Sequence, residues 1–391
     1  MQYNFDEIIP REDTRSVKYD LRTEIFGKSD VLPLWVADMD FRTPDVVIEA
    51  IKRRVDHEIL GYSFRDDAYN AALINWLKRR HQWSIQKEWI AFAPGIVPAF
   101  NMAVMAFTQP DEGIVVQPPV YFPFFGAVKD HERKLILNPL IRQNGNYLMD
   151  YDHLEQCCRE GARMLILCNP HNPVGRAWAP EELRRIGEIC LKYNVLMISD
   201  EIHADLVNRG HKHTVLASLS PEIAARTITM VAASKTFNLA GLGTASVIAS
   251  DPDLLEGYTK MLNAVHVGMG NIFGNVATEA AYNKGEPWLE QLLDYIDGNI
   301  RLLMSYHQRL QPWVSFEAPE ATYMAWLNFS KLGLDDESLN KFIINEAGLG
   351  LNAGIQFGAG GEGFMRINLA CPRATLRKAL DQLEKALFKN F

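Results

Sequence analysis

One lysine lies where an amine is suited to do chemistry. Lys235 follows the apolar run Thr227–Ala232 and is surrounded by small residues in Ala233-Ser234-Lys235-Thr236. The apolar run predicts a buried strand. An ammonium group at the end of such a strand is costly to keep, and lysines kept in such places often form Schiff bases or act as bases. Lys235 is therefore the candidate catalytic residue.

Two polar residues follow neighbouring apolar runs and are candidates for the same site. Asp200 comes after Val195–Ser199, and Asn172 lies in a proline-rich turn after Met164–Cys168. Because ligands of open α/β sheets bind at the carboxyl ends of the strands, both side chains are expected at one sheet edge. Taken alone, Asp200 is better explained as the N-cap of a helix, and Asn172 could simply build its turn; Lys235 after the next strand favours the shared site.

An anion-binding turn is indicated before the helical pattern Ala99–Thr108. Pro94–Pro98 follows a predicted strand, so the first backbone N–H groups of the helix are available to bind a phosphate. These groups belong to Gly95, Ile96 and Val97. A single glycine before a helix is a weak signal compared with a Walker loop. The hydroxyl of Ser234 would supply another donor to the same anion.

Arg366 and Tyr121 are the remaining candidates that the residues themselves suggest. Arg366 lies inside the apolar run Gly363–Leu369 and needs a partner. The planar α-carboxylate of an amino acid suits its bidentate fork, and a structural ion pair is the alternative. Tyr121, in the proline-rich stretch Pro118–Pro123, either stacks on a flat ring or anchors a surface loop.

The elements that must position these residues alternate between strands and helices. The apolar runs are bulky on both faces, as expected of parallel strands buried on two sides. Strands are predicted at Trp89–Ala93, Ile114–Val116, Met164–Cys168, Val195–Ser199, Ile228–Ala232 and Ala245–Ala249. A helix is predicted at Pro180–Tyr193, which opens with proline and two glutamates. The alternation predicts an α/β layered domain.

The two ends of the chain read differently from its centre. Pro287–Leu310 has one long helical pattern that could link two domains, and the last segment carries an apolar helical stripe. The stripe consists of Leu376, Leu380, Leu383 and Leu387. We therefore predict a large domain at residues 46–285 and a smaller one built from residues 1–45 and 286–391.

Composition excludes several classes of partner. A formal net charge of −8 over 391 residues argues against phosphate neutralisation of a nucleic acid and against anionic membranes. No apolar run reaches the length of a membrane span, and Met1–Arg15 lacks the apolar stretch of a signal peptide. Five cysteines without a CxxC pair indicate free thiols in a reducing compartment. We expect a cytoplasmic protein that binds neither nucleic acid nor membrane.

The histidines do not suggest a metal centre. The only close pair, in His211-Lys212-His213, follows Gly210 and is interpreted as a solvated turn rather than a metal site. No metal is expected.

Taken together, these motifs resemble the class I/II aminotransferase superfamily, and within it the C–S β-lyases of the MalY/PatB type, which act as cystathionine β-lyases. Three stretches carry the likeness to this branch: Trp35-Val36-Ala37-Asp38-Met39-Asp40-Phe41, Ser199-Asp200-Glu201-Ile202-His203 and Ser234-Lys235-Thr236-Phe237-Asn238. His203 stands where classical aminotransferases carry a tyrosine. The resemblance runs nearly from end to end of the chain.

The resemblance implies a pyridoxal 5′-phosphate (PLP) enzyme of fold-type I. Its large domain would have a mostly parallel central sheet flanked by helices, and its smaller α/β domain would come from both chain ends. Lys235 would carry the cofactor, Asp200 would hold the pyridine nitrogen and Asn172 would reach the phenolic oxygen. The resemblance further implies that Tyr121 stacks on the ring, that Arg366 binds the substrate carboxylate, and that Tyr62 reaches the phosphate of the neighbouring subunit in a homodimer.

Five further contacts belong to the same expectation. His203 and Ser234 are counted with the cofactor, and Ala37, Asn172 and Tyr121 with the substrate. Classical aminotransferases place a phosphate-binding arginine in the stretch that matches Leu242-Gly243-Thr244, and this chain has none there. The phosphate would therefore depend more on backbone N–H groups, hydroxyls and the partner tyrosine.

The activity implied is PLP-dependent β-elimination on L-cystathionine or a related cysteine thioether, giving a thiol, pyruvate and ammonia. The alternative is an aminotransferase that acts on an amino acid and a 2-keto acid. A regulatory or protein-binding module on an enzyme fold is a third possibility, and retention of Lys235, Asp200 and Arg366 argues against it.

Overall fold

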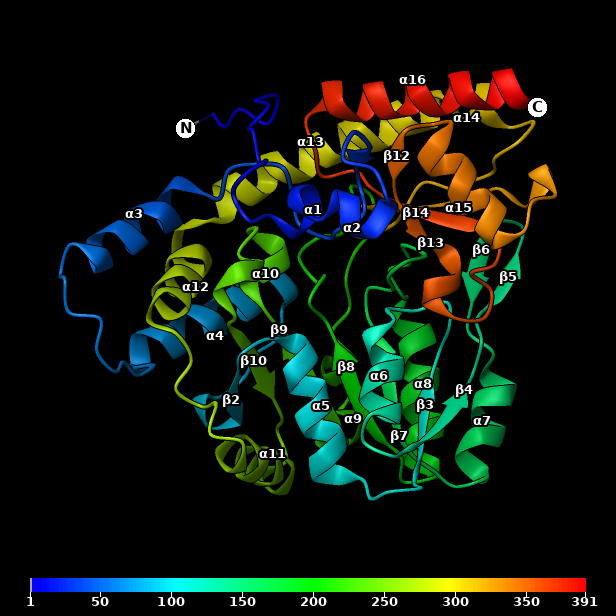
Figure 1. Cartoon of the computed structure of the whole chain (residues 1–391). Helices are drawn as coiled ribbons and strands as arrows, with labels where there is room; N and C mark the ends of the chain where they lie inside the picture. The colour runs from blue at the N-terminus through cyan, green and yellow to red at the C-terminus, as the bar shows by residue number, and fades with distance from the viewer. Residues whose placement is uncertain (1) are drawn as a thin grey trace.

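The computed structural model describes residues 2–391 and is organised around a sheet of seven strands (Figure 1). In spatial order these are β2 (Ile90–Ala93), β10 (Ala245–Ile248), β9 (Thr227–Val231), β8 (Leu196–Asp200), β7 (Ala162–Cys168), β3 (Gly113–Val116) and β4 (Lys134–Leu137). From β9 to β4 all neighbours are parallel, and β10 is antiparallel to both of its neighbours. The predicted mostly parallel sheet is confirmed. The sequence missed β4, an edge strand whose exposed ends weaken its apolar signal.

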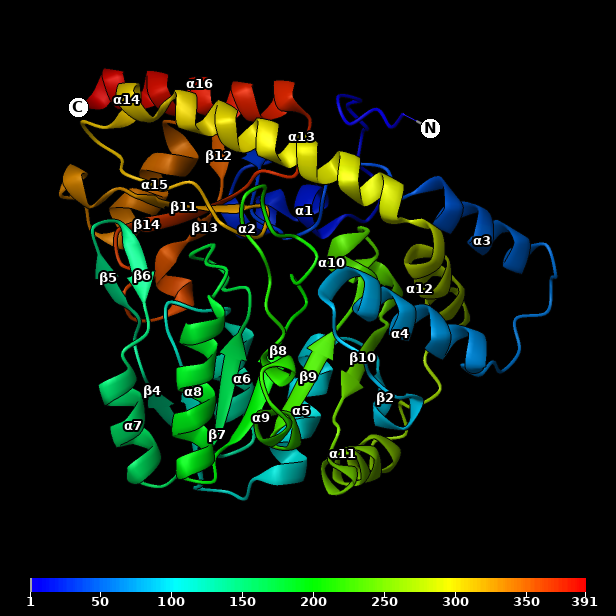
Figure 2. The same ribbon diagram turned by 180° about the vertical axis from the view of Figure 1, so that it is seen from behind.

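Helices cover both faces of this sheet, as the alternation predicted. One face carries α5 (Ile96–Phe107), α6 (Pro123–Lys129) and α11 (Pro252–Ala264), and the other carries α7 (Tyr151–Arg159), α8 (Pro180–Lys192) and α9 (Pro221–Ala225) (Figures 1 and 2). Successive residues of β7 point to opposite faces, so Ile166 packs in one layer while Leu165 and Leu167 pack in the other. Burial on both faces explains why the strands are apolar throughout.

The two ends of the chain meet beyond the carboxyl edge of the large sheet. There β11 (Met324–Asn328), β14 (Phe364–Asn368) and β13 (Asn352–Ala353) form a small antiparallel sheet, and β1 (Leu32–Pro33) pairs with β12 (Leu349–Gly350). The long predicted helix is α13 (Glu286–Ser305), which ends before the short α14 (His307–Leu310). It lies beside α16 (Arg373–Asn390), the predicted C-terminal helix (Figure 2). The domain boundaries near residues 45 and 285 stay predictions.

The remaining elements connect these layers. They are α1 (Val17–Asp20), α2 (Arg22–Phe26), α3 (Asp45–Val55), α4 (Asp67–His81), β5 (Ile141–Gln143), β6 (Asn146–Leu148), α10 (Ala233–Thr236), α12 (Ile272–Lys284) and α15 (Asp336–Asn345). None of the helices within residues 2–391 is both long and apolar enough to cross a bilayer.

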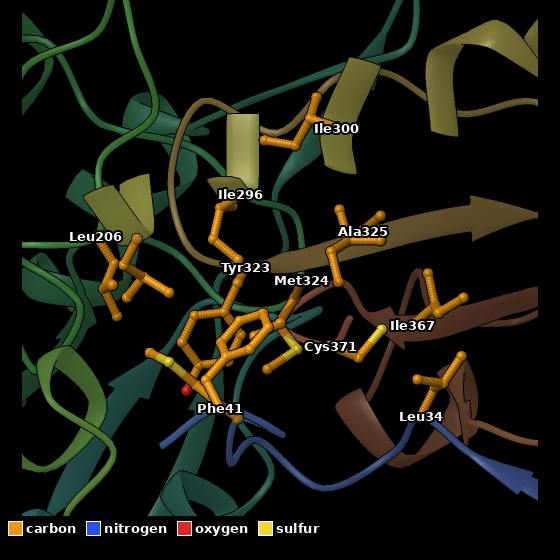
Figure 3. Packing of buried hydrophobic residues seen from close by; sticks show 14 of the residues in the cluster. Leu34, Phe41, Leu206, Ile296, Ile300, Tyr323, Met324, Ala325, Ile367 and Cys371 are labelled. Carbon is orange, nitrogen blue, oxygen red and sulfur yellow. The ribbon is translucent and has the colours of Figure 1, made fainter. Parts of the chain in front are cut away.

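A buried cluster ties the N-terminal segment to the small sheet (Figure 3). Leu34 and Phe41 from the segment before α3 pack with side chains of β11, β14 and α13. The labelled members of the cluster are Leu34, Phe41, Leu206, Ile296, Ile300, Tyr323, Met324, Ala325, Ile367 and Cys371. This packing fixes the irregular stretch 35–41, which has almost no regular secondary structure of its own.

Two expectations about polar groups have different outcomes. All five cysteines are buried free thiols, as expected. The solvated-turn interpretation of the His211/His213 pair is wrong for His213, which is 6% exposed and lies 2.8 Å from Glu201 through Nε2 and Oε2. The buried carboxylate of Glu201 explains the difference, because it needs a polar partner away from water.

Candidate active site

A cavity of about 260 Å³ opens at the carboxyl edge of the large sheet, below the small sheet. The predicted site residues line it, except Arg366 and Tyr62. Those that do are Ala37, Gly95, Ile96, Val97, Tyr121, Asn172, Asp200, His203, Ser234 and Lys235. They come from the ends of several neighbouring strands, as expected for ligand binding in an open α/β sheet.

Lys235 lies in α10, a single helical turn that follows β9. Its Nζ donates a 2.6 Å hydrogen bond to the carbonyl oxygen of Ala37. Burial, followed by the nearby charge of Arg366, lowers the pKa of Lys235 to about 8. Since a nucleophilic or basic amine must be neutral, this lowered pKa makes the neutral form accessible near physiological pH.

Asp200 is the last residue of β8 and is 3% exposed. Burial raises the pKa of Asp200 from 3.8 to about 7. Its Oδ1 accepts a 3.1 Å hydrogen bond from the backbone N–H of Ile202, so one oxygen stabilises the turn after β8, and no helix begins there for Asp200 to cap. A positive charge beside a buried carboxylate stabilises its ionised form. The position therefore suits a protonated ring nitrogen in the cavity.

Arg366 stands behind the cavity and contacts Asn172. Its Nη1 donates to Asn172 Oδ1 at 3.1 Å, and its Nη2 donates to the carbonyl of Trp35 at 2.8 Å and to Asn352 Oδ1 at 2.6 Å. These acceptors are neutral, and no ion pair of Arg366 occurs within residues 2–391, so the structural ion pair is not what holds it. Its buried Nε has no partner, and burial lowers the pKa of the guanidinium to about 10. An anionic ligand would satisfy this buried charge.

The first turn of α5 faces the cavity with free backbone N–H groups. Gly95 precedes the helix with φ of +151°, a conformation that L side chains rarely adopt. Glycine there lets the chain enter the helix with the N–H groups of Ile96 and Val97 at the cavity. Together with Ser234, which also lines the cavity, this forms a cradle for an anion.

Two ring side chains on the wall are neutral. Burial, then the charges of Lys235 and Arg366, lower the pKa of His203 to about 3, and its buried Nδ1 has no hydrogen-bond partner among residues 2–391. Burial, then the carboxylate of Asp200, raise the pKa of Tyr121 to about 12. Tyr121 lines the cavity rather than an outer loop surface, so a stacking role is geometrically open to it.

The segment 35–41 closes the cavity from the small-sheet side. Asn368 donates through Nδ2 to the carbonyls of Val36 and Asp38, at 2.8 and 2.7 Å. Asn238 accepts from the N–H of Met39 at 3.0 Å and donates to the carbonyl of the same residue at 3.1 Å. The backbone of this segment is therefore held by side chains from distant parts of the chain.

Two further residues of the site were not predicted. Tyr323 donates through its hydroxyl to the Ala37 carbonyl at 3.0 Å, the acceptor that Lys235 also uses. Cys168 Sγ accepts from the N–H of Asn172 at 3.4 Å and so fixes the turn. The position of Cys168 at a strand end was a usable signal, whereas Tyr323 has no motif around it.

Tyr62 is not brought to the cavity. Its side chain is 97% exposed, in the irregular stretch between α3 and α4.

Comparison with known proteins places the chain in a family. Residues 29–383 match the family model of aminotransferase class I and II. The chain is 44% identical to the cystathionine β-lyase PatB of Bacillus subtilis over 385 residues, covering 98% of this chain and 100% of that protein. Cystalysin of Treponema denticola, whose structure contains PLP, superposes with a TM-score of 0.96 at 39% identity over 100% of both chains. The PLP-bound C–S lyase of Staphylococcus hominis superposes with a TM-score of 0.92 at 36% identity, over 99% of this chain and 98% of that one. The chain belongs to the class I and II aminotransferase family.

Proposed function

We propose that this protein is a PLP-dependent C–S β-lyase. It would cleave L-cystathionine or a related cysteine thioether into a thiol, pyruvate and ammonia. The observation that carries the proposal is the single cavity lined by both a lysine of lowered pKa and a buried carboxylate of raised pKa, Lys235 and Asp200. The relatives named as cystathionine β-lyase and C–S lyase support the choice of reaction.

The residues of the cavity fit the proposed cofactor. Lys235 would hold its aldehyde carbon, Asp200 its pyridine nitrogen, and the Nδ2 of Asn172 its phenolic oxygen, because the Oδ1 of Asn172 already accepts from Arg366. The first turn of α5 and the hydroxyl of Ser234 would bind the phosphate. When bound, PLP supplies an electron sink that stabilises negative charge at the substrate Cα.

Tyr121 and His203 would contact the cofactor as neutral groups. The aromatic ring of Tyr121 would stack on the pyridine ring. His203 with a pKa near 3 adds no charge to the cavity at neutral pH. The charged side chains near the cofactor ring would therefore be Asp200, which lines the cavity, and Arg366, which lies behind Asn172.

Substrate orientation would depend on Arg366 and the residues around it. The guanidinium would bind the α-carboxylate, with Asn172, Tyr121 and the backbone of Ala37 next to the substrate. Fixing the carboxylate aligns the Cα–H bond for removal, which is catalysis by orientation. The amine of Lys235 would take the Cα proton as a general base, and its lowered pKa favours the neutral form that this step needs.

The choice between lyase and aminotransferase is tested by supplying one substrate. The holoenzyme is incubated with L-cystathionine alone, and pyruvate and thiol are measured against enzyme concentration. A lyase releases many equivalents of both. An aminotransferase would stop after one half-turnover per site without a 2-keto acid, and that result would refute the proposed reaction.

We further propose a homodimer with shared active sites. The stretch between α3 and α4 exposes apolar side chains that a single chain leaves uncovered: Ile59 at 68%, Leu60 at 59%, Tyr62 at 97% and Phe64 at 83%. Exposed apolar clusters of this kind are typical of protein interfaces. In the dimer, Tyr62 would reach the phosphate in the partner's cavity.

Subunit complementation tests the shared site. Tyr62→Ala and Lys235→Ala variants are each expected to be defective. Unfolding and refolding them as a mixture should restore part of the activity, because a mixed dimer has one site with both residues intact. Sedimentation of a monomer at assay concentrations, or a mixture that stays as inactive as its components, would contradict the proposal.

A further inference from the structure

A second buried carboxylate, Asp205, lies five positions beyond Asp200 and is outside the cavity wall. Asp205 is 8% exposed and its two oxygens are fully engaged. Oδ1 accepts from His81 Nε2 at 2.8 Å, and Oδ2 accepts from the hydroxyl of Thr236 at 2.8 Å. The indole N–H of Trp76 donates to both oxygens, at 3.1 and 3.2 Å. Thr236 is the residue directly after Lys235, so this carboxylate is linked to the lysine through one peptide unit.

The chain between Asp200 and Asp205 is held in tight turns. The N–H of Ile202 donates to the Asp200 side chain at 3.1 Å, and the N–H of Ala204 donates to the Glu201 carbonyl at 3.0 Å. Beyond Asp205, the carbonyl of Leu206 accepts from the N–H of Thr322 at 2.6 Å. The Leu206 side chain packs in the cluster of Figure 3. The position of Asp205 relative to Asp200 is therefore fixed by local bonds.

The helix that carries the lysine needs outside support. α10 spans only Ala233–Thr236, and a single turn is unstable by itself because nucleation is costly. Thr236 is fully buried, so losing the partner of its hydroxyl would leave an unsatisfied polar group. The Asp205 oxygen that it meets is charged. Burial alone would raise the pKa of Asp205, but the hydrogen bond and charge of His81, with the Thr236 hydroxyl, bring it below its ordinary value.

We propose that Asp205 and Thr236 are positioning residues that set the lysine amine relative to Asp200. The bond between them connects the strand-end segment of Asp200 to the turn that carries Lys235, so it fixes the separation between the two groups that hold opposite ends of the cofactor. The effect is geometric, because the charges that shift the pKa of Lys235 are those of Arg366, Asp38 and Asp200. The inference rests on the proposed role of Lys235.

A pair of matched valine substitutions tests this inference. Thr236→Val removes only the hydroxyl, and Thr227→Val makes the same change at another buried threonine, whose hydroxyl donates to the Ile223 carbonyl at 2.7 Å at the far end of β9. For each variant we would measure the melting temperature, the PLP concentration that half-saturates the apoenzyme, the visible absorption of the bound cofactor, and kcat and KM for cystathionine.

Thr236→Val is expected to lower kcat by about 10- to 100-fold, because small misplacements of a reacting group cost that much. It should also raise the half-saturating PLP concentration several-fold and shift the visible band. Thr227→Val should lower the melting temperature comparably but leave kcat and PLP binding within about twofold of the parent. Thr236→Ser, which keeps the hydroxyl, should recover most of the kcat and the band position.

Asp205→Asn is the second variant, used whether or not Thr236→Val folds, and it should weaken PLP binding and kcat in the same way. The inference is overturned if Asp205→Asn, and Thr236→Val where it folds, match Thr227→Val in kcat and PLP affinity. Borohydride reduction and peptide mapping, which identify the lysine that holds the cofactor, distinguish the positioning role from the proposed function. If the reduced cofactor is found on Lys235 and Thr236→Val changes neither kcat nor PLP affinity, only the positioning role is overturned. If the reduced cofactor is found on another lysine, both this inference and the proposed function are overturned.

Discussion

The two walls of the cavity are built by different means. The sheet wall consists of strand ends and the first turn of α5, and its residues are placed by the backbone ladder of the large sheet. The opposite wall is the irregular segment 35–41, which is placed by side chains from far along the chain. Lys235 bonds to Ala37 across 198 positions and Arg366 bonds to Trp35 across 331. One wall is positioned by secondary structure and the other by tertiary hydrogen bonds.

The walls also differ in how their charges are balanced. On the sheet wall, Asp200 is buried without an ion-pair partner among residues 2–391, and its pKa is raised to about 7. Behind the opposite wall, Asp40 pairs with Arg11 at 2.6 Å and with the fully buried Lys18 at 2.9 Å, and Asp38 pairs with Arg11 at 2.7 Å. The balanced charges suit a structural role, whereas the unbalanced carboxylate suits a charged ligand.

Lys235 lies on the sheet wall and donates a hydrogen bond to Ala37 on the opposite wall. Its substitution has the largest expected effect of the changes considered. Lys235→Ala should reduce cystathionine cleavage by a factor of about 10³ or more, since both covalent attachment and proton removal depend on the amine. The visible absorption of the lysine-bound cofactor should disappear. Lys212→Ala, at an exposed lysine, is the control and should change neither property. Retained turnover and a retained band in Lys235→Ala would refute the assignment.

Substitution of Arg366 tests whether substrate and cofactor are bound by different walls of the cavity. Arg366→Ala should raise KM for amino-acid substrates by about 100-fold, the size expected when a charged hydrogen-bonded pair is lost. The half-saturating PLP concentration should change by less than about threefold, because the proposed cofactor contacts come mainly from the sheet wall. Arg301→Ala, on the exposed face of α13, is a control for losing one arginine. Equal losses of cofactor and substrate affinity would mean that Arg366 supports the cofactor instead.

The same difference between the walls explains what could be predicted from the sequence. Asp200, Asn172 and the Gly95 turn follow recognisable apolar strands, and parallel strands bring their carboxyl ends to one edge. At these positions, the local sequence pattern therefore predicted which residues lie together in the structure. Tyr323 could not be found in this way, because its relation to Ala37 arises from the packing of β11 against a segment 286 positions earlier.

Two errors have the same origin. His213 directly follows Lys212 and lies three positions after Gly210, which indicates a solvated turn, but its burial depends on the tertiary position of Glu201. The strand β4 was missed because it lies at the sheet edge, where only its two central residues are partly buried and both ends are exposed. The resemblance to the lyase branch supplied the role of Tyr62 and the placement of His203 beside the cofactor, which no pattern in the residues could supply.

The unbalanced charge of Asp200 should make the stability of the apoenzyme depend on pH more strongly than that of the holoenzyme. Because folding raises the pKa of this carboxyl from 3.8 to about 7, its contribution to stability is full below pH 3.8 and is lost as pH rises to about 7. The apoenzyme should therefore lose stability across this interval. A bound cofactor with a protonated ring nitrogen would offset the cost, so the difference in melting temperature between holoenzyme and apoenzyme should grow with pH.

Asp200→Asn tests whether the buried charge of Asp200 destabilises the apoenzyme. At pH 8 the variant apoenzyme should be more stable than the parent apoenzyme, by on the order of 1–2 kcal/mol, since the buried charge is gone. The variant holoenzyme should be less stable than the parent holoenzyme and should have a much lower kcat. Chemical unfolding of both forms at pH 5 and pH 8 measures this. A variant apoenzyme that is less stable at pH 8 would show that the Asp200 charge is already compensated without cofactor.

The smallest expected effect comes from the charge network behind the segment 35–41. Arg11→Gln removes the partner that Asp38 and Asp40 share, so the free energy of unfolding should fall by about 1–2 kcal/mol. KM for cystathionine should rise a few-fold, with PLP affinity unchanged, because only the wall opposite the sheet is loosened. Arg42→Gln, which breaks the exposed pair with Glu7, is the matched control and should do neither. If Arg11→Gln weakened PLP binding as strongly as substrate binding, the two walls would not be independent supports, since loosening one would displace the other.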